Sequence, residues 1–344
     1  MAAAFTTPRA PHPIALAVLQ NSPPAAAFTT PPAPHRHHPG RLRPTAAIHS
    51  PSAAAVRTLR GGTVQATAVQ AAIASAISGA YAVPAAAAIA GVAGTLCYIR
   101  QAYIFSLSYG LSMLGIGIAA LASPAASASA LLKVHAALVA AYGLRLFLFL
   151  FWRQQFQPGY DGMTKLKALD KTPRLKRTPI ILSTAFFYAL MASPLLFHIK
   201  AQPMLGAAAA ISKLGSVLAA IGLVYEAVAD QQKSLFKMGL RADGKEDALF
   251  TSGVYSRSRH ANYAGEILFW VGSFIAGAPA ISAVGLSLAT RASRTVCSAL
   301  GLYGIIFIML SATKRLEGRQ QDKYGATPEY EAYLESTNAL FPKV

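Results

Sequence analysis

Residues 129–152 read SALLKVHAALVAAYGLRLFLFLFW. A helix needs about 20 mostly apolar residues to cross the hydrocarbon core of a bilayer, and this segment is long enough. Its apolar and polar residues do not alternate, so the pattern does not indicate a β-strand. The segment therefore predicts a transmembrane helix.

Segments of this kind recur along the chain. The composition agrees with them, because 54% of the residues are hydrophobic and only 13% are charged, whereas a soluble domain has about 25% charged residues. We therefore predict an all-α fold, a multi-pass transmembrane helical bundle of about seven spans. The expected spans are 84–99, 102–122, 129–152, 179–199, 204–229, 265–288 and 293–312, with a weaker candidate at 66–82.

The distribution of charge tests this layout. The formal net charge is +18, and Asp161 is the first acidic residue of the chain. Basic residues gather in segments 153–178 and 231–262 and in the tail after residue 312. Two expected spans separate each basic segment from the next, so all of them fall on one membrane face, as the positive-inside bias predicts. We expect a site to open to this face and the lipid bilayer to be a partner of the protein. The pattern gives no information on the oligomeric state.

The same sequence argues against nucleic-acid and metal binding. It has no basic helix and no platform of interleaved aromatic and basic residues of the kind that binds nucleic acid. Its two cysteines, Cys97 and Cys297, lie far apart in apolar segments, which predicts buried thiols rather than a disulfide framework or a zinc site. Gly115 and Gly117 resemble a dinucleotide-binding turn, but no strand precedes them, so we interpret them as helix-packing residues.

Residues 1–65 differ from the rest of the chain. They are rich in Ala, Pro, Ser and Thr, contain Arg and His, and include no acidic residue. Frequent proline prevents a packed helix, and an acid-free, Arg- and Ser-containing extension is typical of an organelle transit peptide. We predict a disordered, transit peptide-like extension that directs the protein to a plastid membrane. A mitochondrial or endoplasmic reticulum membrane, or a disordered cytosolic tail, is the alternative.

Several ionisable residues lie inside or at the ends of expected spans, where they are costly and often functional. Arg145 lies within one span, and Glu226 and Asp230 end another with the i, i+4 spacing of one helix face. Two acids on one face repel each other unless cations lie between them, and Lys233 and Lys237 continue the face. The stripe predicts either a site for a polar ligand or a solvated helix end. Arg145 is either functional or extends toward the basic face.

The block at residues 253–270, GVYSRSRHANYAGEILFW, carries polar side chains directly before an apolar span. Asn262, Glu266 and Trp270 follow the i, i+4, i+8 spacing of one helix face. Two arginines precede them, and arginine forks suit phosphates. An amide beside a carboxylate can hydrogen-bond the edge of a nicotinamide or a ribose. The residue chemistry therefore predicts a site for a phosphate-bearing cofactor.

This block resembles the C-terminal signature of the steroid 5-alpha-reductase family, and looks closest to its DUF1295 branch, which typically reads SRHPNYFGE. Further stretches match the family. Residues 226–237, EAVADQQKSLFK, resemble its E-A-x-A-D-x-Q-K-x-x-F motif. The stretch from Tyr142 to Arg145 resembles its G-x-R-L motif, and the tail from Tyr330 to Pro342 resembles its Y-x-x-Y…P ending. The resemblance covers about residues 100–344.

The resemblance implies a transmembrane reductase-like domain over 66–344 whose C-terminal half, at about 204–344, holds NADPH. It implies hydride transfer to a carbon–carbon double bond of a steroid-like or other hydrophobic lipid enone. Tyr142 matches the tyrosine that polarises the substrate carbonyl, where a phenol donor stabilises the enolate oxygen. Arg145 and Glu226 would face the substrate. From the residue chemistry and the resemblance together, the predicted cofactor-binding residues are Asp230, Lys237, Arg257, Arg259, Asn262, Tyr263, Glu266, Trp270, Arg315, Arg319 and Tyr333.

Departures from the family pattern keep other functions open. The steroid enzymes pair the polarising tyrosine with a glutamate of an earlier span, but this chain has no acid before Asp161, and Ala261 replaces the signature proline. We therefore do not expect a 3-oxo-4-ene steroid substrate. One alternative is a membrane S-adenosylmethionine-dependent methyltransferase of the isoprenylcysteine or phospholipid type, although such enzymes commonly carry a Glu-Glu pair where this chain has Glu317-Gly318. The other is a non-catalytic lipid-binding membrane protein on the same fold, which the absent glutamate favours.

Overall fold

The computed structural model describes residues 82–157, 170, 172–201, 203–243, 248–283 and 285–342. The predicted extension over 1–65 lies outside these described residues, and so does the weaker candidate span at 66–82 apart from its last residue. The predictions made for these two segments therefore stay predictions.

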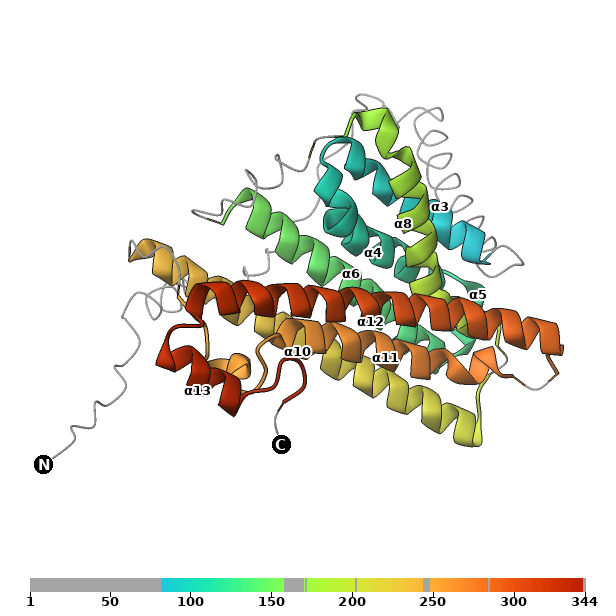
Figure 1. Cartoon of the computed structure of the whole chain (residues 1–344). Coiled ribbons are helices and arrows are strands. Elements are labelled where there is room, and N and C mark those ends of the chain that lie inside the picture. The colour runs from blue at the N-terminus through green and yellow to red at the C-terminus, as the bar shows by residue number, and fades with distance from the viewer. Residues whose placement is uncertain are drawn as a thin grey trace, which may run out of the picture. The chain divides into compact units, whose positions relative to one another are not determined.

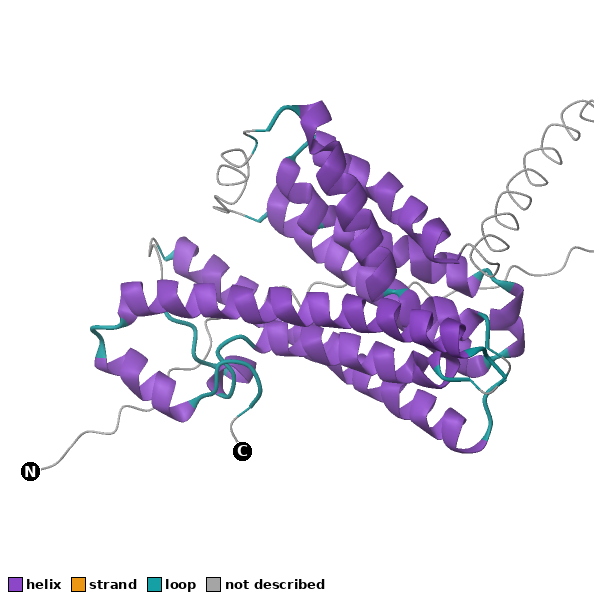
Figure 2. Cartoon of the chain, turned by 45° about the vertical axis from the view of Figure 1, so that its right-hand side comes forward, coloured by secondary structure: helices purple, strands orange, loops and turns teal. Residues whose placement is uncertain are grey.

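The described residues form helices (Figure 1), and no strand occurs among them (Figure 2). In chain order the α-helices are α3 Ala82–Gly94, α4 Leu107–Leu121, α5 Pro124–Ala128, α6 Ala130–Gln155, α8 Thr178–Met191, α9 Ser193–Ile199, α10 Gly206–Ala242, α11 Ala261–Ile281, α12 Leu288–Tyr324 and α13 Pro328–Ser336. Short 3₁₀ helices lie at Thr95–Tyr98, Gln101–Phe105, Arg174–Arg177 and Gly253–Ser256. The predicted all-α class is confirmed.

Four of the described helices, α6, α10, α11 and α12, are long and apolar enough to cross a membrane. The pair α8 and α9 is a fifth candidate if it forms one span, because the two helices are bent by 55° at a short break. The helices Ala82–Tyr98 and Leu107–Leu121 are apolar but shorter, and 3₁₀ turns at Thr95–Tyr98 and Gln101–Phe105 lie between their α-helical parts. The helices fit an integral membrane protein, but the predicted count of about seven spans is not confirmed.

The helices α10 and α11 lie side by side (Figure 1) along a seam of glycines. An added Cβ at Gly222 of α10 would lie 2.4 Å from the backbone nitrogen of Phe269, and one at Gly265 of α11 would lie 2.6 Å from that of Glu226. The two backbones therefore approach so closely that a side chain does not fit, as is common where helices pack in membranes. The seam holds Glu226 beside the first turns of α11, where predicted cofactor residues lie.

A second seam joins α4 and α6. An added Cβ at Gly117 of α4 would lie 2.5 Å from the backbone nitrogen of Ala140, and one at Gly143 of α6 would lie 2.2 Å from that of Leu114. Gly117 is therefore a helix-packing residue, as predicted. The close contact brings Tyr109 and Tyr142 of the two helices near each other, with ring centres 5.9 Å apart.

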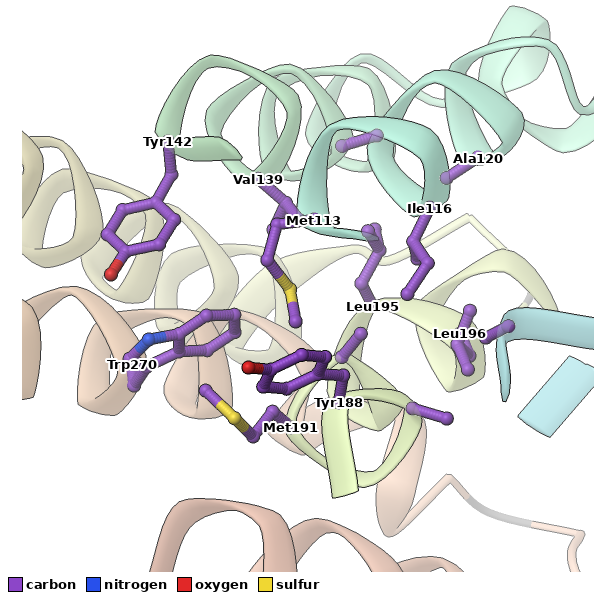
Figure 3. Close-up of a cluster of buried hydrophobic side chains, with 14 of the residues drawn as sticks. Met113, Ile116, Ala120, Val139, Tyr142, Tyr188, Met191, Leu195, Leu196 and Trp270 are labelled. Carbon is purple, nitrogen blue, oxygen red and sulfur yellow. The ribbon is translucent and has the colours of Figure 1, made fainter. Parts of the chain in front are cut away.

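A cluster of large buried side chains joins the two halves of the chain. Figure 3 shows Met113 and Ile116 of α4, Tyr142 of α6, Leu195 of α9 and Trp270 of α11 within it. Each of them is at most 2% exposed. Since lipid tails are as apolar as these side chains, van der Waals packing stabilises such a core in a bilayer more than the hydrophobic effect does. The packing fixes α4 and α6 against α11.

The tail after α13 returns to the start of α11. The backbone N–H groups of Arg259 and His260 donate to the carbonyl oxygens of Asn338 and Ala339, each at 3.0 Å. The Arg259 guanidinium donates to the Glu317 carboxylate, with a shortest distance of 2.7 Å, and His260 Nε2 lies 2.7 Å from the other oxygen of Glu317. Arg259 and His260, which are adjacent in the chain, therefore bind both α12 and the tail to the start of α11.

Candidate functional site

A cavity of about 540 Å³ lies between α4, α6, α8, α10, α11 and α12, and we call it the main cavity. It has a polar part and an apolar part, as small-molecule sites typically do. The polar lining residues are Tyr109, Arg153, Ser183, Thr184, Tyr188, Glu226, Asp230, Asn262, Tyr263 and Glu266, and the apolar ones are Phe105, Leu146, Phe149, Leu150, Phe187, Ile305, Ile308 and Met309.

Arg145 of α6 pairs with two carboxylates of the main cavity. Its guanidinium lies 2.6 Å from Glu226 Oε1 and 2.5 Å from Asp230 Oδ2. It also donates to the backbone carbonyl oxygen of Glu226, at 3.0 Å. Glu226 is only 3% exposed, and a carboxylate is buried in this way only when it is paired. Arg145 therefore binds acids inside the bundle rather than extending toward the basic face, and the two acids do not form a solvated helix end.

One oxygen of Glu226 lacks a partner. Its Oε2 atom is buried and accepts no hydrogen bond from the described residues. A buried acceptor without a donor costs about 1–3 kcal/mol. Glu226 lines the main cavity, but Oε2 itself is covered by its neighbours.

Tyr109 of α4 connects three polar side chains at the main cavity. Its hydroxyl donates to Glu266 Oε1 at 3.0 Å, accepts from Trp270 Nε1 at 2.8 Å and lies 3.1 Å from the Tyr142 hydroxyl. The ring of Tyr188 stacks on it, with the centroids 5.0 Å apart. Tyr109 lines the cavity, whereas Tyr142 is fully buried and directed toward Trp270 (Figure 3). Tyr142 therefore reaches the cavity through Tyr109.

A second cavity, of about 300 Å³, lies among α10, α12, α13 and the loop before α11, and we call it the basic cavity. Cations and aromatic rings dominate its lining, and no carboxylate occurs among the described residues there. Basic side chains of this kind bind phosphates, and aromatic faces accept a stacked ring. The residues concerned are Lys233, Lys237, Arg259, Arg319, Lys323, Phe250, Tyr255, Tyr324 and Tyr333.

Tyr255 and Asn262 form a wall between the two cavities. Tyr255 lines the basic cavity, and its hydroxyl donates to Asn262 Oδ1 at 3.4 Å. Asn262 lines the main cavity, and its Nδ2 donates to Asp230 Oδ1 at 3.3 Å. Burial raises the pKa of the Tyr255 phenol, and the charge of Asp230 raises it further, so Tyr255 remains a neutral donor. The two cavities are thus neighbours.

The structure distributes the predicted site residues over four places. The main cavity contains Glu226, Asp230, Asn262, Tyr263 and Glu266, and the basic cavity contains Lys237, Arg259, Arg319 and Tyr333. Arg145, Tyr142 and Trp270 contact main-cavity residues from outside its lining, and Arg257 and Arg315 are exposed and line neither cavity. The sequence analysis missed Tyr109, Tyr188 and Lys323.

The described residues offer no obvious place for a metal ion. No group of three or more His, Cys, Asp or Glu side chains among them has a metal-binding arrangement. The acids of the main cavity are instead paired with Arg145 or bonded to Tyr109 and Asn262. The main cavity offers carboxylates, an amide and phenols, and the basic cavity offers cations.

The family model DUF1295, described as a protein of unknown function, matches residues 104–337. The chain belongs to the DUF1295 family. This confirms the predicted relationship to the DUF1295 branch of the steroid 5-alpha-reductase-like family. The matched range includes every residue named above as lining the two cavities of this DUF1295 protein. The comparison with curated proteins finds no match, and neither does the comparison with solved structures.

Proposed function

We propose that this DUF1295 protein is a membrane-bound oxidoreductase that uses NADPH to reduce a carbon–carbon double bond of a lipid enone. The observation that carries the proposal is the wall of Tyr255 and Asn262, which separates a basic, aromatic cavity from one with carboxylates, an amide and apolar walls. NADPH has phosphates and an adenine at one end and an uncharged nicotinamide at the other. The two cavities differ in the same way.

The donors and acceptors suit NADPH. In the basic cavity, Lys237, Arg319 and Lys323 would hold phosphates, and the aromatic side chains would contact the adenine. In the main cavity, the Asn262 amide would hydrogen-bond the carboxamide or a ribose hydroxyl. Bound there, NADPH would supply the hydride, and a proton from water would complete the reduction of the double bond.

The chain's own phenols would act on the oxygen of the substrate. Tyr109 lines the main cavity, and rotation of its hydroxyl from Glu266 to an enone oxygen would place a donor where negative charge develops. Tyr142 and Trp270 would keep this hydroxyl in position through their contacts with it. The polarising role predicted for Tyr142 thus passes to Tyr109, with Tyr142 as a positioning residue. The apolar part of the main cavity would hold the hydrocarbon of the substrate.

The basic cavity favours this reaction over the methyltransferase alternative. Arg259 is paired with Glu317 beside the cavity, but the described lining itself contains several cations and no carboxylate, so its charge favours an anionic ligand. NADPH brings phosphates to that place, whereas S-adenosylmethionine carries a positive sulfonium and no phosphate.

Ligand stabilisation of the detergent-solubilised full chain tests the proposal. NADPH at about 100 times its Kd should stabilise the fold by about 2.7 kcal/mol and so raise the Tm, while S-adenosylmethionine should not. Asn262→Ala should abolish the NADPH shift. Arg257→Ala is the matched control, because Arg257 is exposed and lines neither cavity, and it should keep the shift. A shift with S-adenosylmethionine alone, or an undiminished shift in Asn262→Ala, would overturn the proposal.

We propose a plastid membrane as the location, on the composition of residues 1–65. The extension is free of acids and contains arginine and serine, as transit peptides do. Fusion of residues 1–65 to a fluorescent protein tests this assignment. The fluorescent protein should then be imported into plastids. Import into mitochondria, or retention in the cytosol, would contradict it.

A further inference from the structure

A groove of about 570 Å³ lies at the ends of α10, α11 and α12 away from the main cavity, and we call it the distal groove. Figure 1 shows the start of α10, the end of α11 and the start of α12 together. Along α11, Asn262 lines the main cavity and Pro279 lines the groove. At a rise of 1.5 Å per residue these positions are about 25 Å apart, close to the thickness of a bilayer core of about 30 Å. If α11 crosses the bilayer once, the groove lies at the membrane boundary opposite to the basic cavity.

Two cations line the distal groove, Lys200 and Arg294. Arg294 donates to the carbonyl oxygen of Ala280 at 2.7 Å, and its guanidinium lies 5.3 Å from the ring centre of Phe197. These contacts orient the guanidinium and leave it further N–H donors. Both cations line the same groove, and burial, followed by the charge of Arg294, lowers the pKa of Lys200. Within the described residues, Lys200 makes no ion pair.

The segments that line the distal groove contain no acid to balance these cations. The sequence has no Asp or Glu between Asp170 and Glu226, and none between Glu266 and Glu317. Every residue that lines the distal groove falls within these two intervals. Two like charges in one groove disfavour each other, and an anion between them would reverse that interaction.

The remaining wall of the distal groove is apolar and accessible. Met204, Leu205 and Ile211 line it beside Lys200. Leu205 is 82% exposed and Ile211 is 44% exposed. In an integral membrane protein such side chains at the outer surface of the helices contact lipid tails. The groove thus combines cations at a membrane boundary with an apolar wall toward the hydrocarbon.

We propose that the distal groove binds an anionic glycerophospholipid, with its phosphate between Lys200 and Arg294 and an acyl chain along Leu205 and Ile211. Charge complementarity identifies this occupant, because a zwitterionic lipid would bring its own cation to a place that already holds two. The inference does not depend on the proposed reductase activity, since the groove and the two cavities share no lining residue.

Native mass spectrometry of the full chain in detergent tests the proposal. Titration with dioleoylphosphatidylglycerol should show one tightly bound equivalent, at least tenfold tighter than dioleoylphosphatidylcholine. Lys200→Gln and Arg294→Gln should each weaken binding of the anionic lipid by about fivefold, the usual contribution of one cation to affinity for a charged headgroup. If Arg294→Gln does not fold, because it also loses the bond to Ala280, Lys200→Gln alone decides the test.

Arg291→Gln is the matched control, because Arg291 lies in the first turn of α12, is exposed and does not line the distal groove. It should bind phosphatidylglycerol as the unaltered chain does. Equal affinity for the two lipids, or equal losses in Arg291→Gln and Lys200→Gln, would overturn the proposal in favour of general electrostatic attraction. Full competition by millimolar glycerol phosphate would also overturn it, because the ligand would then be the phosphate group alone. The NADPH-induced shift in Tm should be unchanged in Lys200→Gln, which separates this site from the proposed cofactor site.

Discussion

The hydroxyl of Tyr109 has one proton and three polar neighbours. It donates to Glu266 and accepts from Trp270, and the Tyr142 hydroxyl completes its surroundings. A buried network in which every member has a partner holds its atoms in fixed positions. The network thus fixes a phenol at the surface of the main cavity, where a substrate oxygen would meet it.

Replacement of this phenol gives the first prediction at the scale of the residue. Tyr109→Phe should lower turnover of an enone substrate about a hundredfold, because loss of one oxyanion donor costs about 3 kcal/mol. Tyr142→Phe should lower turnover less, since Tyr142 acts through Tyr109. NADPH binding, measured as the shift in Tm, should persist in both variants. Normal turnover in Tyr109→Phe together with a large loss in Tyr142→Phe would return the polarising role to Tyr142.

Residues related by spacing within one helix could be predicted, and residues related by packing could not. Asp230, Asn262 and Glu266 follow from i, i+4 patterns, because such spacing fixes a shared face before the fold is known. Tyr109 could not be found in this way, since its partner Glu266 is 157 positions distant and its own helix contains no charged residue. Only the contact between α4 and α11 reveals it. The same holds for Glu317, whose bond to Arg259 spans 58 positions.

At the scale of the element, the glycine seam between α10 and α11 determines the geometry of the site. α10 carries Glu226 and Asp230, and α11 carries Asn262. The bond from Asn262 to Asp230 is 3.3 Å long, so a small separation of the two helices would break it. Packing of the seam and shape of the site are therefore coupled.

Gly222→Ala tests this coupling. The added Cβ would lie 2.4 Å from the backbone nitrogen of Phe269, and a backbone cannot yield as a side chain can, so the variant should lose about 1–3 kcal/mol of stability. Both the Tm and the NADPH-induced shift should fall. Gly239→Ala in the same helix is the control, since nothing lies within 4 Å of its added Cβ, and it should be neutral or more stable by up to about 1 kcal/mol. Equal Tm values for the two variants would show that the seam is looser than described.

The sequence predicted the positions of the spans more accurately than their number. Hydropathy located the apolar part of α6, α10, α11 and α12, because long apolar runs are a local property of the sequence. It did not anticipate the 55° bend between α8 and α9. Nor did it anticipate the 3₁₀ turns at Thr95–Tyr98 and Gln101–Phe105. These breaks depend on how the short helices pack. Hydropathy averaged over a window of sequence contains no information on that packing.

At the scale of the whole molecule, the charges divide between the two ends of the long helices. Arg257 precedes α11 and Arg315 lies toward the end of α12, whereas Arg291 lies in the first turn of α12. If α11 and α12 each cross the bilayer once, Arg257 and Arg315 lie on one side of the membrane and Arg291 lies on the other. The proposed cofactor and lipid sites would then open to different compartments.

Cysteine labelling with a membrane-impermeant maleimide tests this arrangement in intact vesicles. In a background with Cys97→Ser and Cys297→Ser, Arg257→Cys and Arg315→Cys should be labelled from the same side, and Arg291→Cys only from the opposite side. All three positions are exposed, so labelling reports topology rather than burial. α11 has 21 residues, about the minimum for a crossing. If Arg291→Cys reacts from the same side as Arg257→Cys, α11 does not span the membrane, and the distal groove and the basic cavity would face the same compartment.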